Sequence, residues 1–301
     1  MKIIITGGTG MIGRALSQAL TGRGDEIWVL SRQPEEASHP QGVKVVQWDA
    51  RTGQGWQDIA SQADAMIHLA GANIGARPWT NERKRIIRSS RVESGRAIVE
   101  AIQNSPHKPR ALLQISGVGY YGNTGDLVRD EQSPAGQDFL AGVAADWEAA
   151  TRPVADMGVR HIVLRTGMVL SAGGGGLAPF ILQNRLFAGG PLGSGRQWVS
   201  WIHIQDLVRV FEFLLDQQDA QGIYNATAPE PLTNADFGRT VSQVMRRPYW
   251  VPMPAFLLKA AMGEMSTMAL EGQRVLPKRL LEMGFQFRFP TLRAALQDLI
   301  H

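Results

Sequence analysis

Short apolar runs alternate with amphipathic stretches along the first half of the chain. Residues 2–6, "KIIIT", form a β-branched run stopped by glycine, which is typical of a buried parallel strand. Residues 11–24 carry apolar side chains at helical spacing and end at Gly24. A second helix is predicted within 141–158, and five further strands within 26–32, 43–49, 63–71, 110–122 and 160–170. This alternation predicts an α/β fold, a Rossmann-type doubly wound parallel sheet with helices on both faces.

The pattern changes after about residue 170. Residues 173–176 are four consecutive glycines, which predict a flexible or tightly turning loop, and 189–207 are loop-rich until a helix begins near Asp206. The remaining chain is interrupted by prolines and then becomes helical. We therefore expect residues 1–170 to form the Rossmann domain and 171–301 a smaller C-terminal lobe on the substrate side, interleaved with the first and not independent of it.

Composition excludes several classes of site. The 301 residues include no cysteine, which rules out disulfides, thiolate zinc sites and cysteine nucleophiles. The six histidines show no paired spacing, so no metal site is expected. The stretches "GSGRQ" and "ISGVG" lack the GxSxG form of a serine hydrolase.

Charge and hydropathy bear on the partners and the cellular location of the protein. The formal net charge is +4, but lysines and arginines are spread along the chain without interleaved aromatics, so no nucleic-acid partner is expected. The apolar run 3–5 is too short for a secretory signal, and no run approaches the ~18 residues of a membrane span. A cytoplasmic location without a membrane partner is the expectation.

One basic cluster lies in the predicted helix around residues 81–91. Lys84, Arg88 and Arg91 stand at i, i+4 and i+7 and therefore share one helix face. Two interpretations remain open. The face is solvated, or its C-terminal end at Arg91 reaches a phosphorylated cofactor.

Glycines recur every third residue directly after the first strand. Gly7, Gly10 and Gly13 stand between that strand and the first helix. Glycine suits this turn because the backbone must approach a pyrophosphate closely and the helix must pack against the strand. The free N–H groups of the helix then face the phosphates. The spacing predicts a dinucleotide site.

The end of the second strand distinguishes the two nicotinamide cofactors. An acidic residue there would bind the ribose 2′-hydroxyl of NAD, whereas arginine accommodates the 2′-phosphate of NADP. The sequence has Ser31 and Arg32, and no carboxylate before Glu35. NADP is therefore favoured over NAD, the alternative being that Arg32 is a solvated loop residue.

These motifs resemble the extended, epimerase-like branch of the short-chain dehydrogenase/reductase superfamily. The resemblance covers essentially the whole chain through "TGGTGMIG", "MIHLAG", "SGVGYYG", "GGPLGSGRQWVSWIHIQD" and "NATAPEP", and "LEGQRVLPKRLLEMGFQF" resembles the C-terminal region of unknown function in one subgroup of such proteins. It implies the following cofactor contacts: Gly7, Gly10, Met11, Ile12 and Gly13 at the pyrophosphate, Ser31 and Arg32 at the 2′-phosphate, Asp49 at the adenine, Leu69, Ala70 and Gly71 at the ribose, Arg91 at a phosphate, and Gly167 at the nicotinamide.

The sequence departs from that superfamily at its catalytic pair. Active members usually have Tyr-x-x-x-Lys with a serine or threonine, in which the lysine lowers the pKa of the tyrosine. None of the four tyrosines here has a lysine four residues later, and the helix expected to carry the pair reads "DFLAGVAADWEAA". The usual serine position falls on Gly117. Ser116 points to the opposite strand face unless a bulge shifts the register.

The remaining catalytic candidates are Ser116, Tyr120 and Tyr121, with Asp146, Glu148 and His203 as further titratable groups. Each also has a structural interpretation. The tyrosines would be packed rings, the carboxylates solvated helix residues, and His203 a satisfied histidine beside a helix cap.

Two functions follow. The first is an NADP-dependent oxidoreductase or epimerase that acts on a small polar substrate, such as a sugar-like one, with a nonstandard proton donor. The second is a nonenzymatic NADP-binding redox sensor. A polar cleft beside the nicotinamide would favour the enzyme, and a pocket plugged by Trp201 or Phe139 the sensor. A homodimer is expected from the resemblance alone.

Overall fold

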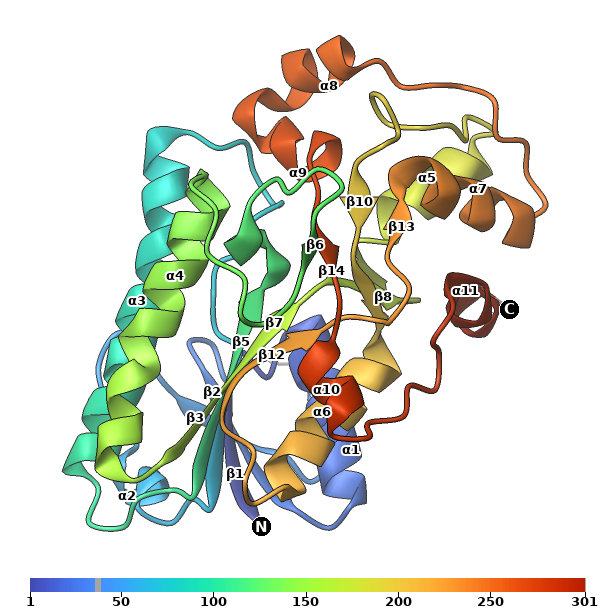
Figure 1. Cartoon of the computed structure of the whole chain (residues 1–301). Coiled ribbons are helices and arrows are strands. Elements are labelled where there is room, and N and C mark those ends of the chain that lie inside the picture. The colour runs from blue at the N-terminus through green and yellow to red at the C-terminus, as the bar shows by residue number, and fades with distance from the viewer. Residues whose placement is uncertain (36–38, 301) are drawn as a thin grey trace.

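The computed structural model describes residues 1–35 and 39–300 and is built on one central parallel sheet (Figure 1). The strand order is β12-β7-β5-β4-β1-β2-β3, and every neighbouring pair is parallel. The predicted doubly wound α/β class is confirmed. The seven strands are β1 (Lys2–Thr6), β2 (Glu26–Ser31), β3 (Lys44–Gln47), β4 (Ala65–His68), β5 (Ala111–Gly117), β7 (Arg160–Thr166) and β12 (Gly222–Ala226).

Helices cover both faces of this sheet because the strand residues are apolar on both sides. Ile3 and Ile5 of β1 face a core that includes α1 (Met11–Gly22) and α6 (Ile204–Asp216). Ile4 faces the opposite core, which α3 (Asn81–Asn104) supplies. Figure 1 shows α3 and α4 (Phe139–Thr151) side by side on one face and α1 with α6 on the other. Alternation along a strand therefore separates the two cores.

Gly167 divides the apolar run 160–170, which the sequence predicts as one strand. β7 ends at Thr166, and β8 (Met168–Ser171) belongs to a separate sheet with β11 (Trp201–His203) and β9 (Gly174–Gly175). A Cβ at Gly167 would lie 2.6 Å from the carbonyl oxygen of Ser200. Backbone from a distant segment thus passes too close for a side chain, and the strand changes partners here.

The four-glycine run is a tight hairpin. β8 and β9 pair antiparallel, with Leu170 opposite Gly175 and Ser171 opposite Gly174. Gly174 and Gly175 both have positive φ, 138° and 74°, which glycine adopts without strain. A Cβ at Gly175 would lie 3.2 Å from the Met11 side chain. The hairpin therefore lies against the start of α1.

The smaller lobe packs on the carboxyl ends of the central strands. Its core gathers Trp201, Phe237 and Phe289. α6 and β12 return to the central sheet from beyond residue 170, so the two parts share the chain, and the expected division at that residue stays a prediction. The sequence did not predict β12. The remaining elements are β6 (Val128–Arg129), β10 (Trp198–Val199), β13 (Leu232–Thr233), β14 (Arg274–Val275), α2 (Gln57–Ala60), α5 (Ala178–Arg185), α7 (Asn234–Val244), α8 (Ala255–Met262), α9 (Thr267–Leu270), α10 (Lys278–Glu282), α11 (Leu292–Ile300) and the 3-10 turns η1 (Val118–Tyr121), η2 (Arg152–Met157) and η3 (Gly263–Ser266).

Candidate cofactor and substrate site

The glycine loop joins β1 to α1 with no space for side chains at two of its three positions. Gly7 has φ +70°, and a Cβ there would lie 2.8 Å from the carbonyl carbon of Leu69. A Cβ at Gly13 would lie 2.4 Å from Cα of Gly8. Gly10 differs, because its added Cβ would meet only the Gly7 carbonyl oxygen, at 3.3 Å. The first and third glycines are required by the fold, whereas a side chain at the second would make one short contact, with a carbonyl oxygen.

The first turn of α1 presents bare backbone N–H groups. Gly10 is the N-cap residue and supplies no side-chain acceptor. The N–H groups of Met11, Ile12 and Gly13 therefore have no partner within the helix, and the helix dipole adds partial positive charge at the same point. This arrangement suits a phosphate or pyrophosphate. The residues present thus fit the dinucleotide that the glycine spacing predicts.

A buried histidine supports the loop from behind, which the sequence did not indicate. Trp147 Nε1 donates to His68 Nε2 at 3.1 Å, so the proton of the neutral ring is on Nδ1 and is directed to Thr6 Oγ1 at 2.8 Å. Burial, with a smaller effect from Arg91, lowers the pKa of His68 to about 3. The ring is therefore an uncharged link between β1, β4 and α4.

The residues expected near the adenosine lie on the outer strands of the same sheet edge. Arg32 follows β2 and is exposed, and Ser31 Oγ accepts from the Gln33 N–H. Asp49 is exposed and accepts from the backbone N–H groups of Arg51 and Thr52. Burial alone would raise the pKa of Asp49, but these hydrogen bonds lower it. The 2′-phosphate and adenine roles stay predictions.

Arg91 approaches the loop that follows β4. Its Nη1 donates to the carbonyls of Ala72 and Ile87, each at 3.0 Å, and its guanidinium lies 4.8 Å from the Trp147 ring centroid. A Cβ added at Gly71 would lie only 3.1 Å from Cζ of the same guanidinium, so glycine leaves the space that Arg91 uses. Burial and the charge of Arg83 lower the pKa of Arg91 to about 10. No carboxylate in the described residues pairs with it, so a bound anion would supply the missing charge.

The rest of the basic helix face is used in packing. Lys84 pairs with Glu264, and Arg88 pairs with Asp146 of α4. Of the three cations that share this face, only Arg91 faces the cavity described below. Asp146, a candidate carboxylate from the sequence, is thus a link between α3 and α4.

A cavity of about 560 Å³ opens at the carboxyl ends of β5 and β7, beside the glycine loop. Its walls include Ile12, Leu69 and Arg91 from the predicted cofactor contacts, and Gly167 where β7 ends. The sequence indicated neither the aromatic wall from Trp79 nor the segment 264–273, which closes one side. The cavity brings the expected nicotinamide position and an open space together.

The side of the cavity formed by α4 is apolar. Phe139, Leu140, Val143, Ala144 and Trp147 all line it. A Cβ at Gly119 would lie 3.4 Å from Leu140 Cβ, so this helix lies directly against the loop after β5. α4 is the helix in which the resemblance predicts the catalytic tyrosine and lysine, and its sequence contains neither. The cavity is therefore open, as the enzyme hypothesis requires, but this side of it is apolar and not the polar surface that would favour an enzyme.

Ser116 belongs to β5 and contributes its hydroxyl to the cavity wall. The register of β5 on β7 is unbroken, with Ser116 opposite Arg165 and Gly117 opposite Thr166, so the described strand contains no bulge here. Ser116 Oγ donates to Glu148 Oε1 at 2.7 Å. The residue faces α4, as its alternation with Gly117 predicts, and still lines the cavity.

Glu148 and Arg165 form a buried ion pair behind Ser116. Arg165 Nε and Nη2 donate to the two carboxylate oxygens at 2.9 and 2.8 Å, and the side chains are 1% and 12% exposed. Burial alone would lower the pKa of Arg165, but Glu148 and Tyr121 together hold it above its usual value. The pair is a fixed link between α4 and β7.

Tyr120 and Tyr121 pack on Arg165 and do not line the cavity. The guanidinium lies 3.3 Å from the Tyr120 ring centroid, and its Nη1 donates to the Tyr121 hydroxyl at 3.1 Å. That hydroxyl donates to Asn225 Oδ1 at 2.7 Å. Burial raises the pKa of Tyr121 to about 12, against the effect of Arg165. The placement does not favour either tyrosine as proton donor, and the catalytic roles stay predictions.

The other candidates lie away from the cavity. His203 is buried, caps α6 by accepting from the Gln205 N–H, and has Nε2 3.2 Å from Asp298. Burial lowers the pKa of His203. Trp201 is fully buried in the core of the small lobe and does not plug the site. Phe139 lines a wall without filling the space.

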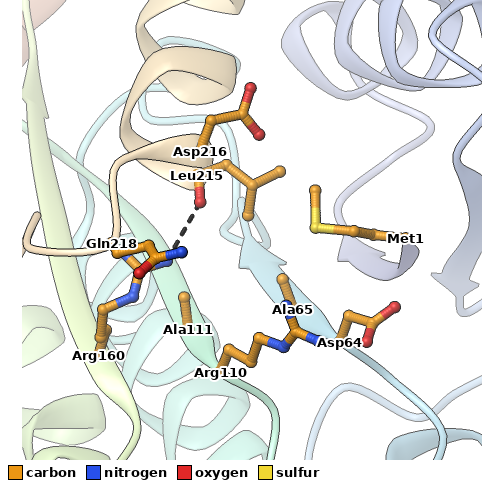
Figure 2. Close-up of a pocket in the computed structure, with 9 residues that line it drawn as sticks. All are labelled: Met1, Asp64, Ala65, Arg110, Ala111, Arg160, Leu215, Asp216 and Gln218. Carbon is orange, nitrogen blue, oxygen red and sulfur yellow. Dashed lines mark hydrogen bonds between the residues drawn. The ribbon is translucent and has the colours of Figure 1, made fainter.

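A second cavity of about 470 Å³ lies at the opposite, amino-terminal edge of the sheet (Figure 2). Asp64, Arg110 and Arg160 are among its lining residues. Arg160 donates to carbonyls at the end of α6, those of Leu215 at 3.1 Å and Gln217 at 2.7 Å. The Arg160 guanidinium therefore acts as a C-terminal cap of α6.

None of the helices in residues 1–35 and 39–300 combines the length and apolar character needed to span a bilayer.

Known proteins resemble this chain over its whole length. The profile of the NAD dependent epimerase/dehydratase family matches residues 3–227, and a domain of unknown function, DUF1731, matches 253–299. The mouse epimerase family protein SDR39U1 is 38% identical over 304 residues, covering 100% of both chains. A crystal structure of human SDR39U1 isoform 2 with NADPH has a TM-score of 0.88 at 36% identity, covering 99% of both chains. A Thermus thermophilus UDP-glucose 4-epimerase in complex with NAD has a TM-score of 0.80 at 19% identity, covering 100% of this chain and 98% of its own, which supports the fold alone.

Proposed function

The chain belongs to the NAD dependent epimerase/dehydratase family, and from that premise we propose that it is an NADP(H)-dependent oxidoreductase or epimerase of the short-chain dehydrogenase/reductase superfamily. The observation that carries this proposal is the cavity itself. One open space is lined both by predicted cofactor contacts, Ile12, Leu69, Arg91 and Gly167, and by a second set of residues outside those contacts, Trp79 and Met268 among them. A site that only bound the cofactor would not need the second set.

The choice of NADP rests on Arg32, and Arg91 adds a phosphate contact that NAD and NADP would share. Arg32 is exposed at the end of β2, where no described carboxylate stands to bind a ribose 2′-hydroxyl. Arg91 is a cation without a carboxylate partner at the edge of the cavity. The structure of human SDR39U1 contains NADPH, which supports the same cofactor here.

The backbone N–H groups at the start of α1 would hold the pyrophosphate, and Arg91 would add a charge-assisted hydrogen bond to a phosphate. When bound, the nicotinamide supplies or accepts a hydride at a substrate carbon. In the reducing direction, the substrate oxygen would take its proton from a water on the cavity wall, which would leave as hydroxide, and the carbonyl would become an alcohol.

Ser116 would orient the substrate oxygen. Its own proton is directed to Glu148 Oε1, so the lone pairs of Oγ remain for an incoming donor. Oγ would accept from a substrate hydroxyl, or from the water that delivers the proton. The Arg165 guanidinium holds the Glu148 carboxylate in place, and that carboxylate holds the Ser116 hydroxyl. Ser116 Oγ would therefore have one fixed position on the cavity wall.

The redox-sensor alternative has an observation of its own. α4 carries only apolar side chains on the cavity wall, including Leu140 and Ala144, and no tyrosine lines the cavity. A protein without a proton-donating pair could report cofactor binding to a partner while turning over nothing.

Titration with NADPH and NADH, followed by nicotinamide fluorescence, tests the proposal. We expect NADPH to bind more tightly than NADH in the wild type, and Arg32→Ala to reduce that preference about tenfold or more through loss of a charge-assisted contact. Arg185→Ala, which removes a cation from α5 away from the cavity, is the matched control. Equal affinity for both nucleotides would reject the NADP assignment.

Transfer of deuterium from the labelled nicotinamide C4 of NADPH to added carbonyl compounds then separates the two functions. Label in a product, lost in Ser116→Ala, supports the enzyme. Tight NADPH binding without deuterium transfer to any of the aliphatic, aromatic and sugar carbonyl compounds tested supports the sensor.

A further inference from the structure

The wall opposite the glycine loop is an aromatic and aliphatic surface. Trp79 and Phe139 pack edge to face, with ring centroids 5.1 Å apart and an interplanar angle of 67°. Ile74 and Val143 extend this surface, and all four residues line the cavity. Aromatic pairs of this geometry form rigid apolar platforms.

Three polar side chains around this platform already have hydrogen-bond partners within the protein. Trp79 Nε1 donates to the Ile74 carbonyl at 2.9 Å, so the indole has no proton left for a ligand. Asp138 Oδ1 accepts the Ala141 N–H as the cap of α4, at 2.8 Å. Thr267 Oγ1 donates to the Glu264 carbonyl at 2.9 Å. A sugar ring, which needs a hydrogen bond for each buried hydroxyl, would find few partners here.

The apolar surface continues to the outside. Met268 of α9 lines the cavity and is 42% exposed. α8 stands beyond α9 at the same end of the molecule (Figure 1), and none of its residues is buried. Phe256 on that helix is 69% exposed. An apolar molecule would therefore meet hydrocarbon from the entrance to the cavity floor.

We propose that the substrate is an apolar, ring-bearing molecule and not a nucleotide sugar, held between the Trp79–Phe139 platform and Met268, with its single oxygen linked to Ser116 Oγ through the water that delivers the proton. This proposal rests on the proposed function for its cofactor. The cavity volume, about 560 Å³, lies within the range of ~300–1,000 Å³ typical of small-molecule sites, and the nicotinamide would occupy part of it beside the substrate. Polar side chains such as Arg91, Thr166 and Gln273 also line the cavity, but apolar side chains predominate, which suits a ligand with few polar atoms.

Binding of 2-acetylnaphthalene and of UDP-glucose, measured by calorimetry with and without saturating NADPH, tests the substrate class. We expect the naphthyl ketone to bind. We expect UDP-glucose to give no more heat of binding with the NADPH-saturated protein than with the NADPH-free protein. Phe139→Ala should weaken the ketone about tenfold, because it removes one face of the platform.

Met268→Gln should disturb folding less than Phe139→Ala, because the Met268 side chain is already 42% exposed. It should weaken the ketone severalfold. Met283→Gln is its control, since Met283 is 36% exposed and lies outside the cavity lining. Wild-type affinity in Met268→Gln and Phe139→Ala would place the ketone elsewhere and overturn the proposal, as would tighter binding of UDP-glucose.

The two proposals fail in different ways. If NADPH does not bind to the same sample, the proposed function fails, and the cofactor-free titrations still decide the substrate class. If NADPH binds and the ketone does not, only the apolar substrate is rejected.

Discussion

Removing the Arg165 guanidinium should destabilise the protein far more than removing a surface cation. Arg165 is 1% exposed and Glu148 12% exposed, so Arg165→Met leaves a carboxylate in a dry environment with only Ser116 as a partner. Breaking a buried pair by deleting one partner costs about 3–5 kcal/mol. At about 2 °C per kcal/mol for a chain of this size, the melting temperature should fall by about 6–10 °C.

The Arg88–Asp146 pair provides the matched control, because it also joins α4 to a neighbouring element. Its side chains are 56% and 42% exposed, and surface pairs of this kind contribute about 0–1 kcal/mol. Arg88→Met should therefore change the midpoint of urea unfolding very little. Differential scanning calorimetry and urea unfolding on both variants would measure the contrast.

The double variant Glu148→Leu/Arg165→Met decides the physical cause. If the cost of Arg165→Met comes from an uncompensated charge, removing the charge as well should recover about 1–2 kcal/mol. A cost for Arg165→Met no larger than that for Arg88→Met would refute the reasoning. So would a double variant as unstable as the sum of the two single variants.

Three further predictions concern pH and the glycines. The pKa values of His68 and His161, lowered by burial to about 3 and about 4, lie below the unfolded value of ~6.5. The unfolded chain therefore binds protons first as pH falls, and the free energy of unfolding should drop by about 1.4 kcal/mol per pH unit for each histidine between pH ~6 and ~4; a flat urea profile would contradict this. Gly10→Ala should weaken NADPH binding with an unchanged melting temperature, whereas Gly13→Ala, whose Cβ would lie 2.4 Å from Gly8, should lower both. Gly167→Ala should lower the melting temperature by several degrees in a thermal shift assay, because the methyl group would lie 2.6 Å from a backbone oxygen; an unchanged value would show that the two segments can separate.

The sequence predicts the fold well where the signal is local. Apolar runs such as residues 2–6 mark buried strands because parallel strands are covered on both faces. The break at Gly167 could not be predicted from the run 160–170, since it depends on Ser200, which approaches only in the folded chain. β12 was missed because its five residues include a buried asparagine and tyrosine and carry no continuous apolar run.

The candidate site divides in the same way. The glycine loop is encoded by consecutive residues, so its place between β1 and α1 follows from spacing alone. The link from Ser116 through Glu148 to Arg165 joins a strand, a helix and a second strand. The apolar cavity wall likewise combines Trp79 with Met268. Residues so far apart in the chain leave no periodicity by which sequence reasoning could pair them.

The central sheet also dictates when the site can form during synthesis. Gly167, on the cavity wall, donates its N–H to the carbonyl of Ala226, and Gln273 lines the same cavity. A growing chain therefore exposes the edge of β7 until β12 has emerged, and it cannot complete the site until Gln273 has been translated. Such non-local pairing slows folding and leaves an unpaired strand open to aggregation. The nascent protein should depend on chaperones most strongly between the emergence of β7 and that of β12, and ligand should protect only the finished chain.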